Sequence, residues 1–146
     1  MIKKLYLLAG AALIASLSFS AGMATNQSNG TMAALNDMDW QPMEEGSPLQ
    51  MVTLWGDTTT NDYGARFNLP PGWEFPVHMH NAEYYGINLT GTWRHYIDGG
   101  ESRDLPPGSF VHEVGGQMHG DKCVGPSNCI LFLHQHAPAD YIPKEE

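Results

Sequence analysis

The chain has 146 residues, of which 16 are acidic and 7 are basic, so its formal net charge is −9. A surface of this sign repels nucleic acid and anionic membranes, and no basic cluster offsets it. We therefore expect no nucleic-acid partner.

Residues 1–24 have the layout of a secretory signal peptide. Lys3 and Lys4 precede a nearly unbroken apolar run over residues 5–17, and cleavage after Ala24 satisfies a small-x-small rule, with cleavage near Ser20 as an alternative. The apolar run is short for a membrane span, although a retained anchor is the other interpretation. We predict a periplasmic or secreted protein that has no membrane contact after removal of the signal, and whose charge goes from −9 to −11 with the loss of two lysines.

Residues 25–45 are predicted to form a flexible or extended N-terminal segment, and residues 46–142 a single domain. From residue 51 onward, short strand-like runs alternate with turn residues at spacings of about 8–12, and no sustained period of 3.6 is present. This pattern predicts an all-β sandwich or barrel. The expected strands cover 51–56, 63–69, 75–80, 84–91, 92–97, 109–114 and 129–136.

The stretch "PPGWEFPVHMHNAEYYGINLTG" holds two histidines one residue apart, His78 and His80. On a strand they share one face, with Met79 on the other. Imidazoles that point together into a barrel are natural metal ligands. Taken alone, the pair fits two half-exposed strand histidines equally well.

A second stretch, "LPPGSFVHEVGGQMHG", has another Pro-Pro-Gly turn, a strand, a Gly-Gly turn and then His119. Together the two stretches resemble the cupin superfamily, whose first motif is G-x5-H-x-H-x3/4-E-x6-G. Gly72, His78, His80 and Gly91 match that motif, and His119 takes the place of the histidine in the second motif.

The resemblance implies a jelly-roll (double-stranded β-helix) cupin barrel that holds a metal with three histidines and one glutamate. Carried over by position, the histidines are His78, His80 and His119. Tyr84 stands where the family has its glutamate, and Glu83 lies one residue early, on the other face of a regular strand. Because a bulge could re-aim it, Glu83 remains a candidate ligand. Tyr84 is either a ligand or a hydrogen-bonding group for the substrate.

Besides Tyr84, His112 is the other candidate catalytic residue. It shares a strand face with Phe110 on the strand that leads to His119, so it is expected to support the metal or to line the pocket. Simple surface exposure is the alternative.

Cys123 and Cys129, in "CVGPSNC", flank a predicted turn. In an exported protein they are expected to form a disulfide, which stabilises by roughly 2–3 kcal/mol through loop closure. A redox-active pair is the alternative. Farther on, His134 and His136 form a second HxH pair that could line the mouth of the barrel.

These features predict an exported metal-binding cupin that acts on a small molecule inside the barrel as a dioxygenase, lyase or isomerase. The metal is a divalent transition ion: Fe, Zn, Ni, Mn or Cu. The alternative is a non-catalytic module that binds a small molecule or a metal. The pattern looks most like small exported cupins and like the cupin halves of metal-binding anti-sigma regulators, and a homodimer is left open.

Overall fold

The computed structural model describes residues 30–145, so the predicted signal peptide lies outside the described part. The described part contains eleven strands and one short 3-10 helix. Their bounds are η1 Leu35–Asp37, β1 Gln41–Pro42, β2 Gln50–Gly56, β3 Tyr63–Leu69, β4 Glu74–Met79, β5 Tyr84–Thr90, β6 Trp93–Ile97, β7 Ser102–Leu105, β8 Phe110–Glu113, β9 His119–Cys123, β10 Cys129–Gln135 and β11 Ile142–Pro143.

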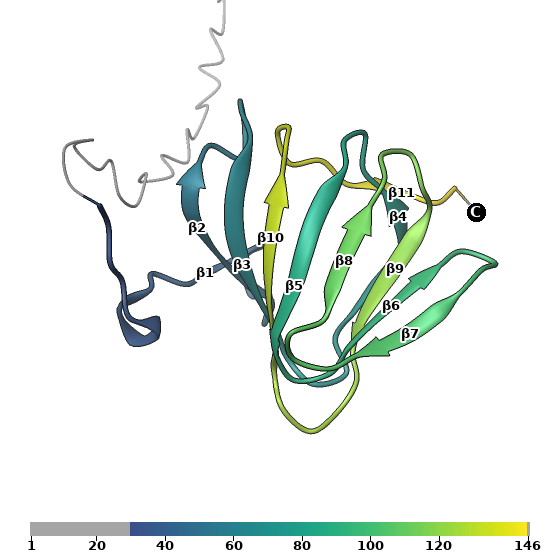
Figure 1. Cartoon of the computed structure of the whole chain (residues 1–146), viewed down its shortest axis with the longest axis horizontal. Helices are drawn as coiled ribbons and strands as arrows, with labels where there is room; N and C mark the ends of the chain where they lie inside the picture. The colour runs from purple at the N-terminus through teal and green to yellow at the C-terminus, as the bar shows by residue number, and fades with distance from the viewer. Residues whose placement is uncertain (1–29, 146) are drawn as a thin grey trace, which may run out of the picture. The chain divides into compact units, whose positions relative to one another are not determined.

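The strands form two antiparallel sheets (Figure 1). One sheet has the order β1-β2-β3-β10-β5-β8, and the other has the order β11-β4-β9-β6-β7. Strands far apart in the sequence therefore lie side by side, as β3 does with β10 and β4 with β9. Two such sheets, linked by crossing connections, confirm the predicted jelly-roll fold.

The seven expected strands are present, with ends that differ by at most one residue. Besides the two-residue strands β1 and β11, two longer strands, β7 and β9, were not expected. The first is a mostly exposed edge strand of sequence SRDL, which has no apolar alternation. The second, HGDKC, directs polar side chains inward and therefore lacks the apolar signal by which a buried strand is recognised.

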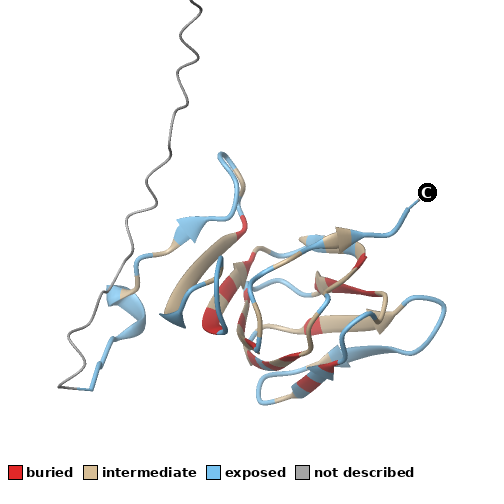
Figure 2. Cartoon of the chain, turned by 90° about the horizontal axis from the view of Figure 1, so that it is seen from above, coloured by how far each residue is buried: buried red, intermediate tan, exposed pale blue. Residues whose placement is uncertain are grey.

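Alternation along the strands separates an inner from an outer face (Figure 2). The register divides the interior into two ends. At one end Leu69 pairs with Cys129, and both are fully buried. At the other end Gln135 pairs with Tyr63 on one side and Tyr84 on the other, so the interior is more polar there.

The predicted disulfide between Cys123 and Cys129 is present and joins the end of β9 to the start of β10, with a Cα–Cα distance of 5.6 Å. Within the expected N-terminal segment, residues 30–45 hold η1 and β1, which pairs with β2. No helix in the described residues is long and apolar enough to cross a membrane.

Candidate metal centre

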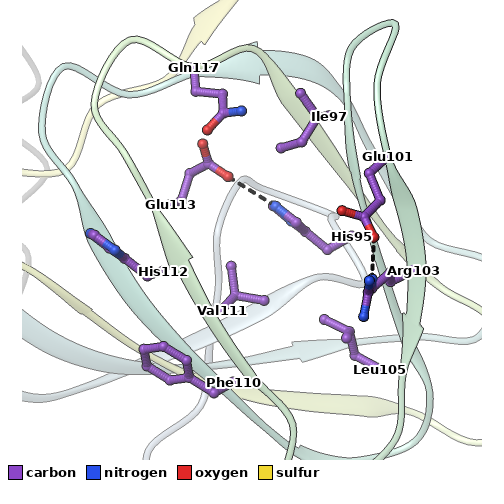
Figure 3. A pocket seen from close by; sticks show the side chains of 10 residues that line it. All are labelled: His95, Ile97, Glu101, Arg103, Leu105, Phe110, Val111, His112, Glu113 and Gln117. Atoms are coloured by element: carbon purple, nitrogen blue, oxygen red, sulfur yellow. Dashed lines mark hydrogen bonds and ion pairs between the residues drawn. The ribbon is translucent and has the colours of Figure 1, made fainter.

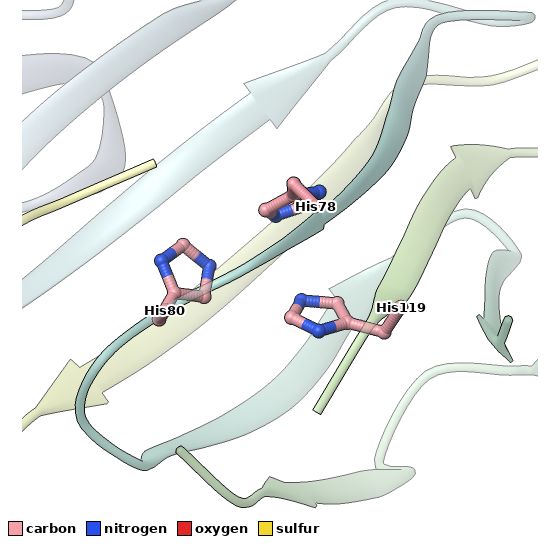
Figure 4. A group of neighbouring side chains, drawn as sticks. All are labelled: His78, His80 and His119. Atoms are coloured by element: carbon pink, nitrogen blue, oxygen red, sulfur yellow. The ribbon is translucent and has the colours of Figure 1, made fainter. Parts of the chain in front are cut away.

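Three histidines meet at the polar end of the interior. Pairing of β4 with β9 sets His78 opposite His119, and His80 follows directly after β4 on the same side as His78. One ligand atom from each ring can be chosen so that all three lie within 4.8 Å of one another. Figure 4 shows the three rings gathered in one space between the strands.

Each of the three rings is held by a backbone carbonyl at Nδ1. The Nδ1 atoms lie 2.7, 2.6 and 2.9 Å from the carbonyl oxygens of Pro76, Asp140 and Gln117 for His78, His80 and His119 respectively. Because a carbonyl only accepts, each Nδ1 carries the proton and each Nε2 keeps its lone pair. A hydrogen bond of this kind is what orients histidine ligands of protein-bound metals.

Burial keeps the rings of His78 and His119 neutral. It lowers the pKa of His78 to about 4 and also lowers the pKa of His119. Metal ligation requires neutral imidazole, so these two side chains are in the correct protonation state at neutral pH. Three neutral nitrogen donors with free lone pairs fit a divalent transition metal.

Tyr84 lies beside this group. Its hydroxyl is 3.5 Å from Nε2 of His119, and its side chain is buried. Burial raises the pKa of Tyr84 well above its usual value, so the phenol is neutral and can donate a hydrogen bond into the site.

The structure does not bring Glu83 or His112 to the three histidines. Because Tyr84 points inward, Glu83 lies on the outer side, where its carboxylate accepts a 2.8 Å hydrogen bond from Nε2 of His112. That bond lowers the pKa of Glu83, and both side chains are about two-fifths exposed, at 42% and 40%.

A buried charge array next to His119 was missed by the sequence analysis. His95, on β6, places Nδ1 2.8 Å from Asp121 and Nε2 2.9 Å from Glu113. Trp93 donates a further 2.7 Å hydrogen bond to the same oxygen of Asp121. Both carboxylates are buried, with 2% of Glu113 and 6% of Asp121 exposed.

The array carries one positive and two negative charges. Burial opposes the charge on His95, but the hydrogen bonds to Asp121 and Glu113 outweigh it and raise the pKa of His95 to about 9. Asp121 also lies 3.9 Å from Nε2 of His119, and Glu113 lies 3.7 Å from its Nδ1. The remaining net negative charge favours a cation at the neighbouring histidines.

Same-face spacing was the signal that could have found the array. Asp121 follows His119 by two residues, and His95 follows the buried Trp93 by two. On β8 the inward residues are Val111 and Glu113, whereas His112, the residue predicted from the sequence to line the site, points outward.

A pocket of about 310 Å³ opens between β7 and β8, the edge strands of the two sheets. His95 and Glu113 line it and point toward each other in Figure 3. Phe110 and His112 lie at its β8 side. Through His95 and Glu113, the charge array borders this pocket, and through Glu113 and Asp121 it borders His119.

The second HxH pair lies elsewhere. Gln135 is buried, so His134 and His136 project from the outer face of the six-stranded sheet and do not line the interior. They approach Asp62 there.

Comparison with family models matches residues 28–139 to the ChrR Cupin-like domain. A search of curated proteins found no match. Among solved structures, KdgF from Halomonas sp. superposes with a TM-score of 0.62 at 22% identity, covering 77% of this chain and 98% of that one.

Two further structures share the fold. An RmlC-like cupin from Shewanella frigidimarina NCIMB 400 has a TM-score of 0.60 at 19% identity over 76% of this chain and 93% of its own. The polyketide cyclase RemF from Streptomyces resistomycificus has a TM-score of 0.64 at 17% identity over 81% and 87%. At these identities the likeness establishes the fold alone.

Proposed function

Since the chain belongs to the ChrR cupin-like family of the cupin superfamily, we propose that it is an exported enzyme that holds a divalent transition metal and acts on a small molecule. The observation that carries this proposal is the convergence of three imidazoles, of which one ring nitrogen each can be chosen within 4.8 Å of the others, and each of which is fixed by a carbonyl at Nδ1. A buried cluster of neutral imidazoles without a ligand is costly to assemble, and a metal accounts for it.

In this proposal His78, His80 and His119 hold the metal. When bound, the metal would supply Lewis-acid polarisation of a substrate oxygen or activation of dioxygen, as Fe, Zn, Ni, Mn or Cu can. Tyr84, a neutral phenol 3.5 Å from Nε2 of His119, donates a hydrogen bond to the substrate and orients it.

Asp121 is the carboxylate that lies near Nε2 of His119, at 3.9 Å, and is the proposed proton acceptor. One of its oxygens is occupied by Trp93 and His95, and the other lies 3.9 Å from Nε2 of His119. Burial by itself would raise the pKa of Asp121, but the hydrogen bond and the charge of His95 outweigh this effect and lower the pKa. The carboxylate is therefore ionised at neutral pH. His95 holds the carboxylate in this orientation, and Glu113 holds His95.

The pocket between β7 and β8 is the proposed entrance for the small molecule. His112 lies at its rim with Glu83, so we assign this pair to the entrance and not to the metal. A dioxygenase, a lyase and an isomerase all remain within the proposal, because the same fold hosts each chemistry.

The second candidate is a non-catalytic binding module, and the identity of residue 84 favours it. A tyrosine in place of the carboxylate leaves no acid among the ligands, so the metal retains more positive charge and binds anionic ligands well. The Tyr84→Phe variant separates the two functions: an enzyme loses turnover, whereas a binding module keeps its ligand affinity.

Metal content tests the site itself. Purified protein lacking residues 1–24 is loaded with one metal at a time, dialysed against a weak chelator and analysed by mass spectrometry for bound metal. We expect the triple variant His78→Gln, His80→Gln and His119→Gln to lose one tightly held equivalent per chain. His112→Gln is the matched control, because it removes an exposed histidine, and it should keep that equivalent. Equal retention in both variants would refute the site.

Export is part of the same proposal. The Cys123–Cys129 disulfide is consistent with an oxidising compartment, and residues 1–24 have the signal-peptide pattern.

A further inference from the structure

We propose a second, separate metal site formed by Asp62, His134 and His136 on the outer face of the six-stranded sheet. One ligand atom from each of the three side chains can be chosen so that all lie within 4.8 Å of one another. The site takes a borderline divalent transition ion such as Zn²⁺ or Cu²⁺, for which two imidazoles and one carboxylate are suitable ligands.

Strand register brings the three side chains together. His134 and His136 alternate with the buried Gln135 on β10, so both project outward. Gln135 pairs with Tyr63 of β3, and Asp62 directly precedes Tyr63. The carboxylate of Asp62 therefore lies beside the end of β10. The sequence does not reveal this contact, because 71 residues lie between Asp62 and His134.

The separation of the donors suits a metal. Oδ2 of Asp62 lies 3.6 Å from Nε2 of His134. Two ligand atoms that are each about 2.1 Å from a tetrahedral ion lie about 3.4 Å apart. The observed separation is close to that span and too long for a hydrogen bond.

His134 itself lacks a partner. Within residues 30–145, Nε2 of His134 is shielded from solvent and no hydrogen bond reaches it. The indole of Trp55 lies over Gly64 and packs near the His134 ring, with the two ring centroids 5.7 Å apart. A polar atom that is shielded in this way is costly unless it has a ligand, which a metal between it and Asp62 would provide.

The loop that carries Asp62 is ordered. The side chain of Asp57 accepts hydrogen bonds from the backbone of Thr59 and from the hydroxyls of Thr59 and Thr60. The backbone amide of Asp57 in turn donates to the carbonyl of Asp62. Asp62 is thus presented from a defined turn, while its exposed side chain, 57% accessible, can still adjust toward the ion.

This outer site is independent of the three inner histidines, because it lies on the outer face of the six-stranded sheet, whereas His78 and His119 lie on β4 and β9 of the other sheet and point into the interior. Its openness predicts weaker binding than at the inner site, since water competes for the remaining coordination positions. It also predicts exchange of the bound ion with added chelators on a shorter timescale.

The test is a Zn²⁺ titration, measured by calorimetry, of four proteins that all lack residues 1–24. The wild type should bind two ions. The outer variant, Asp62→Asn, His134→Gln and His136→Gln, should lose only the weaker ion, and the inner variant, His78→Gln, His80→Gln and His119→Gln, should lose only the tighter one. His112→Gln, an exposed histidine of the same sheet, should keep both.

Loss of a metal ligand should weaken binding by more than the 10–100-fold typical of an outer-shell change, so the single variant Asp62→Asn should lower the weaker affinity at least about 100-fold. Asp62 is exposed, so this variant tests the site even if the triple variant fails to fold. An unchanged weaker affinity in Asp62→Asn, or a wild type that keeps one ion held only by the inner histidines, would overturn the proposal. Loss of only the tighter ion in Asp62→Asn would also overturn the proposal, because it would place Asp62 at the inner site.

Trp55 provides a second readout. Cu²⁺ bound at the outer site should quench Trp55, whose ring centroid is 5.7 Å from that of His134. Titration with Cu²⁺ should show a quenching phase that disappears in Trp55→Phe and in Asp62→Asn but persists in the inner variant. Persistence of that phase in Asp62→Asn would contradict the site.

Discussion

Replacement of His95 by glutamine should destabilise the metal-free protein more than any other single histidine change that leaves the core packing intact. His95 lies between two buried carboxylates, at 2.8 Å from Asp121 and 2.9 Å from Glu113. Glutamine keeps an amide donor of similar reach but carries no charge. The variant therefore leaves two buried carboxylates without a counter-charge.

The magnitude follows from the pKa of His95, which rises from 6.5 to about 9. At 1.36 kcal/mol per pKa unit, a shift of this size corresponds to about 3 kcal/mol of stability. Removal of one partner from a buried ion pair costs a similar amount, about 3–5 kcal/mol. Both approaches give about 3 kcal/mol at neutral pH.

The pH dependence has a definite sign. Because the folded pKa of His95 lies above the unfolded value, its contribution is fully present below pH 6.5 and is lost as the pH rises through about 9. The free energy of unfolding of the wild type should therefore fall by about 3 kcal/mol between pH 6.5 and 9. The variant His95→Gln should lack this fall.

Urea denaturation in the presence of a chelator, at half-unit steps from pH 6 to 9.5, measures both effects. His112→Gln is the matched control because His112 pairs with a carboxylate that is exposed, and its stability should stay close to the wild-type value. A loss below about 1 kcal/mol in His95→Gln, or a wild type whose stability is flat over this range, would refute the reading of the array as a buried ion triad.

Three other predictions concern separate features. Glu83→Gln should leave the affinity for the inner metal unchanged, since Glu83 pairs with His112 away from the site, and a tenfold loss in a chelator-competition assay would return Glu83 to the ligand set. Reduction of the Cys123–Cys129 disulfide should lower the free energy of unfolding by roughly 2–3 kcal/mol without release of metal, as thermal unfolding and metal analysis would show, and coincident metal loss would contradict this. Mass spectrometry of the protein from its native host should find residues 1–24 missing, and an intact N-terminus in a cytoplasmic fraction would exclude export.

The sequence was sufficient to predict the fold and the main group of histidines. Turn punctuation and period-two runs are local properties, and they correctly predicted an all-β chain with seven of its strands. Alternation alone also predicts that His78 and His80 lie on the same face of their strand. His119 was reached through the spacing of the second motif, and the structure brings its ring within 4.5 Å of His78, measured between centroids.

Tertiary structure alone decided the charges around those histidines. His95 and Asp121 meet through the pairing of β6 with β9, and Glu113, on β8, reaches His95 only because the two sheets face each other. Same-face spacing indicates that His95 points inward with Trp93, but nothing within a few residues of His95 indicates that its partners are the carboxylates at positions 113 and 121. The same holds for Asp62 and His134, which the pairing of β3 with β10 brings together.

The physical reason for this difference is the range, along the chain, of the interactions that fix each feature. Alternation of side chains follows from backbone geometry, which each residue carries by itself, so the sequence by itself determined seven of the strands, the common face of His78 and His80, and the cysteine pair six residues apart. A hydrogen-bonded ion pair depends on which strands become neighbours and in what register, and a one-residue slip would turn each of these side chains to the opposite face. The tertiary structure therefore decided that Glu83 turns outward to His112, while the charges next to His119 come from Asp121 and Glu113.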